Sequence, residues 1–332
     1  MTIQKEVYVG LDTHRENIHG TALDRDGNVV QAYEFGNNEE ELKNFFRNFD
    51  PSKTFIALEA CNFWRGCYKI LKEMSFNTDL ADPVKTSQIS KQKKTDWVDS
   101  RILADLSRTN YLPKIFIPSE DILVLRDLTR RRIRLTRICV KVQNSIKACL
   151  SRNGIAYEKD IWNKKGIEWL NSLKNEEVDS FLRIYIETDK EEKNTKKKIE
   201  TTAKLNEDAI KLKSIPGVGY FSALMIVSEI GDINRFPDVK SLHAYVGLVP
   251  GIYQSGTKTR GSKRKNVNYW LKFIVGQCSG RSITLKRNNK IQRTFLRMEK
   301  KKGYKVARRV AARKLLTIVW HILKEKTPYH ES

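Results

Sequence analysis

The sequence offers little that would suit a secreted, zinc-binding or membrane-embedded protein. Its 332 residues include five cysteines, and none forms a C-x-x-C pair or lies at zinc-finger spacing from a histidine. Scattered thiols in odd number are typical of a reducing compartment. No apolar run approaches the length of a membrane span, and the opening residues MTIQKEVYVGLD contain no apolar signal core. We therefore expect a soluble, cytoplasmic protein.

Acidic residues are also scarce relative to basic ones. Lys and Arg total 62 against 39 Asp and Glu, which gives a formal net charge of +23. Such an excess predicts a polyanionic partner, and nucleic acid is the first candidate. A ribosome-associated or merely basic protein is the alternative. A membrane surface is less favoured, because we find no basic amphipathic helix with an exposed aromatic face.

The first 118 residues have the pattern of an α/β domain. VYVGL, IHGTAL and VVQAYEF read as three antiparallel strands, the last two joined by the Asp26-Gly27 turn. Alternating helices and strands follow, including the strand KTFIALEA that ends near Glu59 and a helix over TDWVDSRILADLSR. This order predicts a mixed sheet with helices packed on it.

The remainder of the chain is predicted to be mainly helical. In residues 119–211, a heptad spacing of Leu128, Leu135, Val142 and Cys149 indicates a long amphipathic helix that forms part of a coiled-coil connector. We expect this connector to be helical and to mediate self-association. From residue 212 onward, LKSIPGVGYFSALMIVSEIG opens a C-terminal domain of apolar helices.

Four acidic residues occupy positions at which they could form one site. Asp12 and Glu59 end predicted strands, and Asp96 and Asp99 lie three residues apart on one predicted helix. Carboxylates that share a pocket repel one another unless a cation joins them, and Mg²⁺ or Mn²⁺ prefers such oxygen ligands. We predict a divalent metal site that acts on a phosphodiester. The simpler reading is that each acid ends a turn or caps a helix.

Two further segments suggest contact with phosphates. IPGVG at 215–219 resembles the turn of a helix–hairpin–helix, in which Gly217 and Gly219 let backbone N–H groups approach a phosphate; a plain helix–helix turn is the alternative. Downstream, YQSGTKTRGSKRKN places Ser255 in a predicted loop. Five cationic residues follow it within ten positions and would give the loop a dense positive charge: Lys258, Arg260, Lys263, Arg264 and Lys265. From these residues alone, a phosphate-gripping loop is favoured over a nucleophilic serine.

Taken in order, these motifs resemble the DEDD transposases of the IS110 type, which include the Piv-type DNA invertases. YVGLDTHRENIHG, FIALEACNFWRGCYKIL and KTDWVDSRILADL are similar to the family's three carboxylate motifs. IPGVGYFSALMIVSEIGDINRF and LHAYVGLVPGIYQSGTKTRGSKRKN are similar to its C-terminal transposase domain. Two positions depart from the family pattern. Ser100 stands where Ala is frequent, and Gln254 where many relatives have a second serine.

The resemblance implies several properties that the composition does not reveal. It implies a RuvC-like (RNase H-like) N-terminal domain with a magnesium-binding DEDD site, and Ser255 as the nucleophile that cuts DNA. It also implies a homo-oligomer, dimeric or tetrameric, in which the carboxylates of one protomer face the serine of another. Donor and target DNA would be its substrates, and a structured noncoding RNA of the insertion sequence would guide it.

Two other functions remain open at this point. A metal-dependent RuvC-like junction resolvase or nuclease would use water as its nucleophile, and it would form no covalent protein–DNA adduct. A non-catalytic nucleic-acid-binding protein would use the four acids only as caps and ion pairs. The four acids argue against the second function, because a simple binder gains nothing from carboxylates that face DNA.

We predict strongly salt-dependent, largely non-specific binding to DNA and RNA. With several phosphate contacts, affinity should fall by roughly a thousandfold between 50 and 200 mM salt, since each contact releases counterions. Lys263→Ala with Arg264→Ala should weaken binding to all sequences and flatten the salt dependence. Filter binding across a salt series measures both effects. The charged run TDKEEKNTKKKIETTAKLNED has weak apolar spacing, which predicts a solvated helix face. Lys196→Ala with Lys197→Ala removes the same charge from this run and should change the slope less; an equal change would contradict the assignment.

Overall fold

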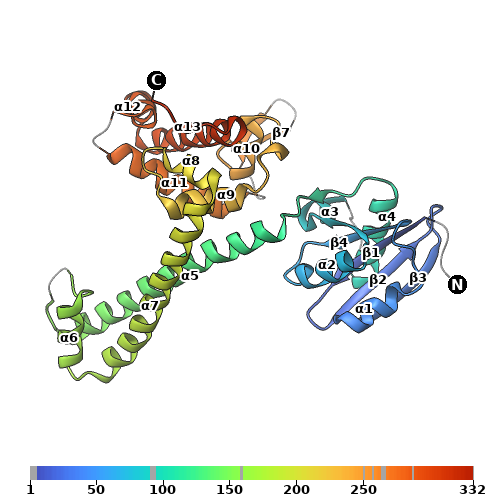
Figure 1. Cartoon of the computed structure of the whole chain (residues 1–332), viewed down its shortest axis with the longest axis horizontal. Helices are drawn as coiled ribbons and strands as arrows, with labels where there is room; N and C mark the ends of the chain where they lie inside the picture. The colour runs from blue at the N-terminus through green and yellow to red at the C-terminus, as the bar shows by residue number, and fades with distance from the viewer. Residues whose placement is uncertain are drawn as a thin grey trace. The chain divides into compact units, whose positions relative to one another are not determined.

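The computed structural model describes residues 6–89, 95–157, 160–249, 251–255, 258–262, 267–285 and 288–331, without the side chains of 250–266 (Figure 1). The chain forms two compact units, residues 1–117 and 118–332. Each unit has its own hydrophobic core, and each is described by itself below.

The first unit contains a six-stranded mixed sheet of strand order β3-β2-β1-β4-β5-β6. Strands β1, β2 and β3 are antiparallel, as predicted, whereas β4 and β5 run parallel to β1. The sequence analysis did not anticipate α3 or the short β6. The elements are β1 (Val7–Thr13), β2 (Asn17–Leu23), β3 (Val29–Gly36), α1 (Glu39–Phe46), β4 (Thr54–Glu59), α2 (Trp64–Glu73), β5 (Asn77–Ala81), α3 (Pro83–Ile89), α4 (Asp96–Arg108) and β6 (Lys114–Ile115).

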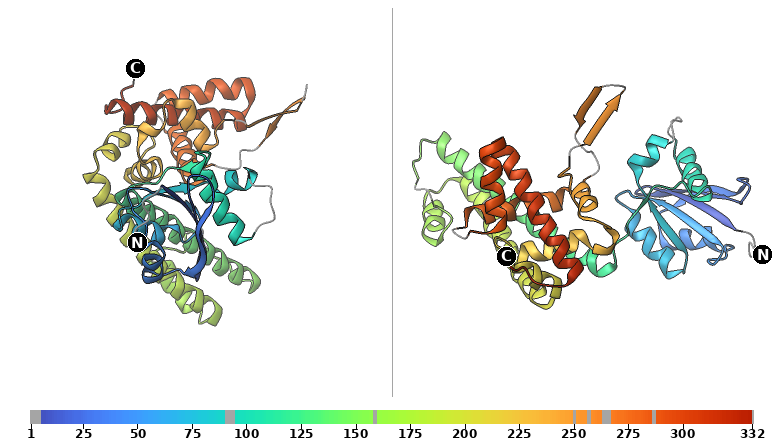
Figure 2. Two further views of the ribbon diagram at one scale, coloured as in Figure 1. Left: turned by 90° about the vertical axis from the view of Figure 1, so that its right-hand side faces the viewer. Right: turned by 90° about the horizontal axis from the view of Figure 1, so that it is seen from above.

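Helices cover both faces of this sheet (Figure 2). On one face, α1 and α2 pack against apolar strand residues such as Leu11 and Leu58. On the other, α4 packs against the small residues Ala57 and Ala81. Successive strand residues point to opposite faces, so the residues of β1 with even numbers, including Gly10 and Asp12, face α4.

Gly10 allows α4 to lie very close to β1. A Cβ atom at Gly10 would lie 1.9 Å from the carbonyl oxygen of Ser100 and 2.5 Å from the backbone nitrogen of Ala104. Beside it, the Ser100 hydroxyl is buried and lies 2.8 Å from the Thr21 hydroxyl on β2. Backbone contact at Gly10 and a buried hydrogen bond therefore fix α4 against the sheet.

Over the residues that the structure describes, the second unit is helical apart from one hairpin. Its longest helices are α5 (Glu120–Arg152) and α7 (Glu176–Leu205), with α6 (Lys164–Ser172) between them in sequence. The C-terminal body follows, and one large apolar cluster holds its helices together. Its elements are α8 (Glu207–Lys213), α9 (Tyr220–Ile230), η1 (Ile233–Arg235), α10 (Val239–Val246), β7 (Gly251–Ser255), β8 (Lys258–Ser262), α11 (Tyr269–Thr284), α12 (Lys290–Lys302) and α13 (Tyr304–Glu325).

Helices α5 and α7 form an antiparallel pair within one chain (Figure 1). Arg131 pairs with Glu191 at 3.2 Å, whereas Arg152, which lies further along α5, pairs with Glu177, which lies earlier in α7, at 2.6 Å. Two positions of the predicted heptad, Val142 and Cys149, are buried in the cluster that α5, α6 and α7 share. The predicted long helix is therefore present, and these two positions pack inside the chain; self-association through it remains a prediction.

The segment around Ser255, expected to be a loop, is a two-stranded antiparallel hairpin. Ser255 ends β7 and pairs with Lys258, the first residue of β8. Glycine and, to a lesser degree, lysine are depleted in strands on average, which favoured a loop at the level of sequence. Among the described residues, no helix is long and apolar enough to cross a membrane.

The close approach at Gly10 predicts a large and local effect on stability. Gly10→Ala should lower the free energy of unfolding by about 3 kcal/mol, because its methyl group would displace the α4 backbone. Gly66→Ala is the matched control. It lies in α2 with nothing within 4 Å of its Cβ position, and it should stabilise the protein by about 0.5 kcal/mol. Urea unfolding compares the two, and equal effects would exclude the proposed contact.

Candidate functional site

Asp12 and Glu59 lie at the same edge of the sheet and face the same side. β1 and β4 are parallel neighbours, and their register ends at the pair Leu11 and Leu58, so the next residue of each strand is the acid. Just beyond, the Thr13 hydroxyl lies 2.9 Å from the Cys61 sulfur, which ties the two strand ends together. Because residues in register on parallel strands share a face, both carboxylates belong to the α4 side.

Helix α4 brings the other two predicted acids to this edge. Asp96 and Asp99 lie in its first turn, where the helix dipole favours negative charge. Asp12 is 6% exposed. Burial raises the pKa of Asp12; His14 counteracts the rise, whereas Asp96 and Asp99 add to it. Both acids of α4 are thus close enough to Asp12 to act on its charge.

Two histidines that the sequence analysis did not single out lie among these carboxylates. His14 Nε2 lies 3.3 Å from Asp12 Oδ2 and 3.6 Å from Asp96 Oδ1. His19, which pairs with Asp12 across β1 and β2, is buried, and its Nε2 lies 3.4 Å from Asp96 Oδ2. Alternation in β2 places His19 on the same face as Thr21, but its position beside Asp12 depends on the register of β1 and β2. His14 follows the end of β1, where strand alternation no longer predicts the direction of a side chain.

The donor atoms at this edge suit a divalent cation. Within the described residues, Asp12, His14 and Asp96 form a group whose donor atoms all lie within 4.8 Å of one another. Asp99 and Glu59 are outside that group, although Asp99 affects Asp12 electrostatically and Glu59 faces the same side. The carboxylates offer the oxygen ligands that Mg²⁺ and Mn²⁺ prefer, and His14 adds an imidazole nitrogen. The residues therefore fit a metal.

The two glycines of the predicted phosphate-binding turn have different surroundings. Gly217 has φ +89°, and a Cβ there would lie 2.6 Å from the Ser282 hydroxyl and 2.8 Å from the Cys278 carbonyl on α11. Gly219 has open space around it and precedes α9, whose first turn receives no side-chain cap. Gly217 thus permits helix packing, while Gly219 is placed where backbone N–H groups could meet an anion.

The structure locates the predicted nucleophile by its backbone alone. Ser255 is the last residue of β7, and Lys258 and Arg260 lie on β8. Their side chains, and the whole of Lys263, Arg264 and Lys265, lie outside the described residues. Ser255 belongs to the second unit, whereas Asp12, Glu59, Asp96 and Asp99 belong to the first.

Comparison with known proteins identifies the class. A family profile described as a DEDD transposase of the IS110 type matches residues 9–154, and a second, for the transposase IS116/IS110/IS902 family, matches residues 209–297. The first match includes all four carboxylates and the second includes the hairpin. The chain therefore belongs to the IS110 family of transposases, DNA transposases whose DEDD class implies a divalent metal.

Individual relatives agree with this assignment. The transposase of insertion sequence IS1111A from Coxiella burnetii is 27% identical over 82% of this chain and 79% of its own length. The transposase of IS1328 from Yersinia enterocolitica is 23% identical over 82% of both chains. A pilin gene-inverting protein of Moraxella bovis is 31% identical over 40% of this chain and 41% of its own.

The raised pKa of Asp12 predicts how its substitution changes the response to pH. Because folding raises the pKa of Asp12, this carboxyl contributes stability that is fully present below its unfolded pKa of about 4. The contribution is lost as the pH rises through the folded pKa. Asp12→Asn cannot ionise, so it should become more stable relative to the wild type as pH rises through that window. Urea midpoints in chelator measure this. The exposed Asp26→Asn serves as control, and a relative stability that falls with pH would contradict the prediction.

Proposed function

We propose that this protein is an insertion-sequence transposase that cuts and rejoins DNA through a phosphoserine intermediate at Ser255. The observation that carries this proposal is the buried Asp12 beside His14 and Asp96, at an edge that also receives Glu59 and Asp99. A fold gains no stability from acids gathered in this way, because desolvation and like charge both oppose them. A role in chemistry at a phosphodiester accounts for them.

In the proposed reaction, the Ser255 Oγ–phosphorus bond forms as the phosphorus–oxygen bond to the leaving strand breaks. The serine loses its proton, and the departing DNA oxygen gains one to become a hydroxyl. In the second half, a DNA hydroxyl attacks the phosphoserine, and the serine recovers its proton. One phosphodiester is made for each one broken, so no ATP is required.

Residues of the sheet edge have defined roles in this scheme. Asp12, Glu59, Asp96 and Asp99 would hold Mg²⁺ or Mn²⁺, with His14 as a nitrogen ligand. A divalent ion there supplies positive charge to the phosphodiester oxygens. His19 orients Asp96 from the buried side, and the strand order β3-β2-β1-β4-β5 supports a RuvC-like assignment of this domain.

The family resemblance supports the remaining parts of the proposal. We assign residues 1–118 to the metal-binding domain, 119–211 to a connector with coiled-coil character and 212–332 to the serine domain with its helix–hairpin–helix turn. Donor and target DNA are the substrates, a structured RNA is the guide, and the active site is composite within a dimer or tetramer. Gly219 and the cations Lys258, Arg260, Lys263, Arg264 and Lys265 would contact nucleic-acid backbones.

A hydrolytic junction resolvase is the second candidate, and one observation favours it. All four carboxylates lie in the first unit, which has its own core, while Ser255 lies in the other. The first unit could therefore cleave DNA with water and without the serine. Such a reaction would leave a nick and no protein–DNA linkage.

We predict that Ser255→Ala abolishes covalent attachment to DNA. With DNA, the element's RNA and Mg²⁺ supplied, the wild type should give an adduct that survives denaturation. Ser255→Ala should reduce adduct formation and recombination by at least about a thousandfold, because the alanine methyl group cannot attack phosphorus. DNA affinity should stay within about twofold, since a neutral hydroxyl contributes little to counterion release.

The neighbouring hydroxyl of the hairpin is the matched control. Ser262→Ala removes the same group from β8 and should leave the adduct intact, while Asp12→Ala should abolish it. An adduct that persists in Ser255→Ala but disappears in Ser262→Ala would reassign the nucleophile. Efficient cleavage by the wild type without any adduct would replace the transposase mechanism with the resolvase.

A further inference from the structure

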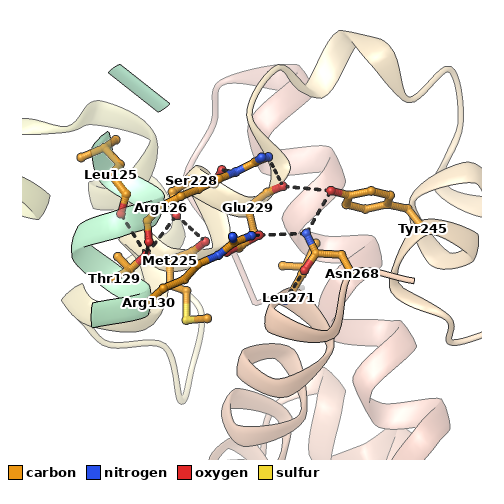
Figure 3. Close-up of polar contacts among 10 residues, drawn as sticks. All are labelled: Leu125, Arg126, Thr129, Arg130, Met225, Ser228, Glu229, Tyr245, Asn268 and Leu271. Carbon is orange, nitrogen blue, oxygen red and sulfur yellow. Dashed lines mark hydrogen bonds and ion pairs between the residues drawn. The ribbon is translucent and has the colours of Figure 1, made fainter. Parts of the chain in front are cut away.

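A fully buried acid, Glu229, lies at the end of α9 in the second unit (Figure 3). Arg130 of α5 donates to both of its oxygens, from Nε to Oε1 at 2.7 Å and from Nη2 to Oε2 at 2.8 Å. This paired geometry is the strongest that an arginine makes with a carboxylate. The ion pair joins helices that are about a hundred residues apart in sequence.

Asn268 extends this network to the ends of the segment that contains the hairpin. Its Nδ2 donates to Glu229 Oε2 at 2.9 Å and to the Tyr245 hydroxyl at 2.9 Å. Its Oδ1 accepts from the Leu271 backbone N–H at 2.8 Å and caps α11. One side chain thus joins the buried acid, the end of α10 and the start of α11, as Figure 3 shows.

The two ends of the hairpin segment meet at this point. Tyr245 and Asn268 flank the segment that contains β7 and β8, and the Asn268 N–H donates to the Tyr245 carbonyl at 2.8 Å. Gly247 has φ +69°, and a Cβ there would lie 2.6 Å from Val267 Cγ1. The chain therefore leaves and re-enters the helical body through adjacent residues.

Helix α5 supports the same region through a second arginine. Arg126 Nε donates to the Ser228 carbonyl at 2.7 Å, and Nη2 to the Glu229 carbonyl at 3.0 Å. These carbonyls belong to the last turn of α9, which lacks partners within its own helix. Burial lowers the pKa of Arg126. Arg126 and Arg130 of α5 thus both bind the C-terminal end of α9.

Stability alone does not explain this network. Apolar residues of similar volume usually stabilise a core as well as a buried ion pair does, since desolvation of the charges offsets their attraction. Hydrogen bonds instead fix direction. From this geometry we propose that Arg130, Glu229, Asn268 and Tyr245 form a positioning clamp that holds the two ends of the segment containing the β7–β8 hairpin and so places Ser255. This inference rests on the proposed role of Ser255 as nucleophile.

The test compares one substitution at two helix caps. Asn268→Ser keeps a residue type that caps helices well, but its short side chain cannot reach Glu229 or Tyr245. Asn206→Ser makes the same change at the cap of α8, where the Asn206 Oδ1 accepts from the Ala209 N–H at 2.8 Å. Tyr245→Phe is a milder variant of the clamp, since it removes only a hydroxyl.

Two measurements on the full-length protein decide the outcome. Hydrogen–deuterium exchange should quicken in β7 and β8 for Asn268→Ser, and to a smaller degree for Tyr245→Phe, but stay unchanged for Asn206→Ser. The rate of adduct formation at saturating DNA and RNA should fall at least tenfold for Asn268→Ser, with DNA affinity within about twofold of the wild type. A merely structural role would lower the active fraction and leave the rate per active molecule unchanged.

Each contrary result has a distinct meaning. Unchanged exchange in the hairpin for both clamp variants would overturn the clamp, as would quicker exchange with an unchanged adduct rate. If the wild type forms no adduct, the proposed function of Ser255 fails. The hairpin exchange still tests the clamp in that case, so the two failures can be told apart.

Discussion

The contact between α4 and β1 at Gly10 is the constraint on which the carboxylate site depends. A helix normally packs on a sheet through side chains, but here the Ser100 carbonyl oxygen lies 1.9 Å from the position that a Cβ atom would take. Because α4 is held so close, the first turn of the helix brings Asp96 to Asp12 and to two histidines. A larger residue at Gly10 would separate the acids without altering any of them.

Electrostatics within the site follow from that proximity. Burial is the main reason that the pKa of Asp12 is raised, and the neighbouring Asp96 and Asp99 carboxylates add to the rise. His14 counteracts this rise from beside Asp12, while His19 places a ring nitrogen beside Asp96. The site thus combines groups that are unfavourable alone but compatible when a cation is shared, as is common where function rather than stability selects the residues.

Local patterns predicted much of the first unit. The three antiparallel strands, Glu59 at the end of β4 and Asp96 with Asp99 in one helical turn follow from alternation and helical spacing. The histidines were missed because His14 lies beyond the strand and His19 counts only once its register with Asp12 is known. The β7–β8 hairpin was missed because its composition resembles a loop.

Contacts distant in sequence were beyond such patterns. Nothing local to Glu229 indicates that it meets Arg130 and Asn268, and the heptad of α5 did not reveal that its partner would be α7 of the same chain. Gly217 likewise resembled a phosphate-binding residue until its contact with α11 was known. In each case the decisive neighbour comes from another element, and only the folded chain identifies it.

Helix α5 contributes to two separate apolar clusters, with Ile133 in the C-terminal body and Cys139 in the cluster shared with α6 and α7. Because each residue of an α-helix turns the chain by about 100°, inserting one residue between these two would rotate the far cluster around the helix axis. Insertions of about seven or eleven residues complete whole helical turns, so they restore the direction of the side chains beyond them. Matched insertions of these lengths in α5 and α7 would lengthen the helix pair and keep both clusters facing their partners. The lengths of the α5–α7 pair among relatives should therefore differ in steps rather than continuously.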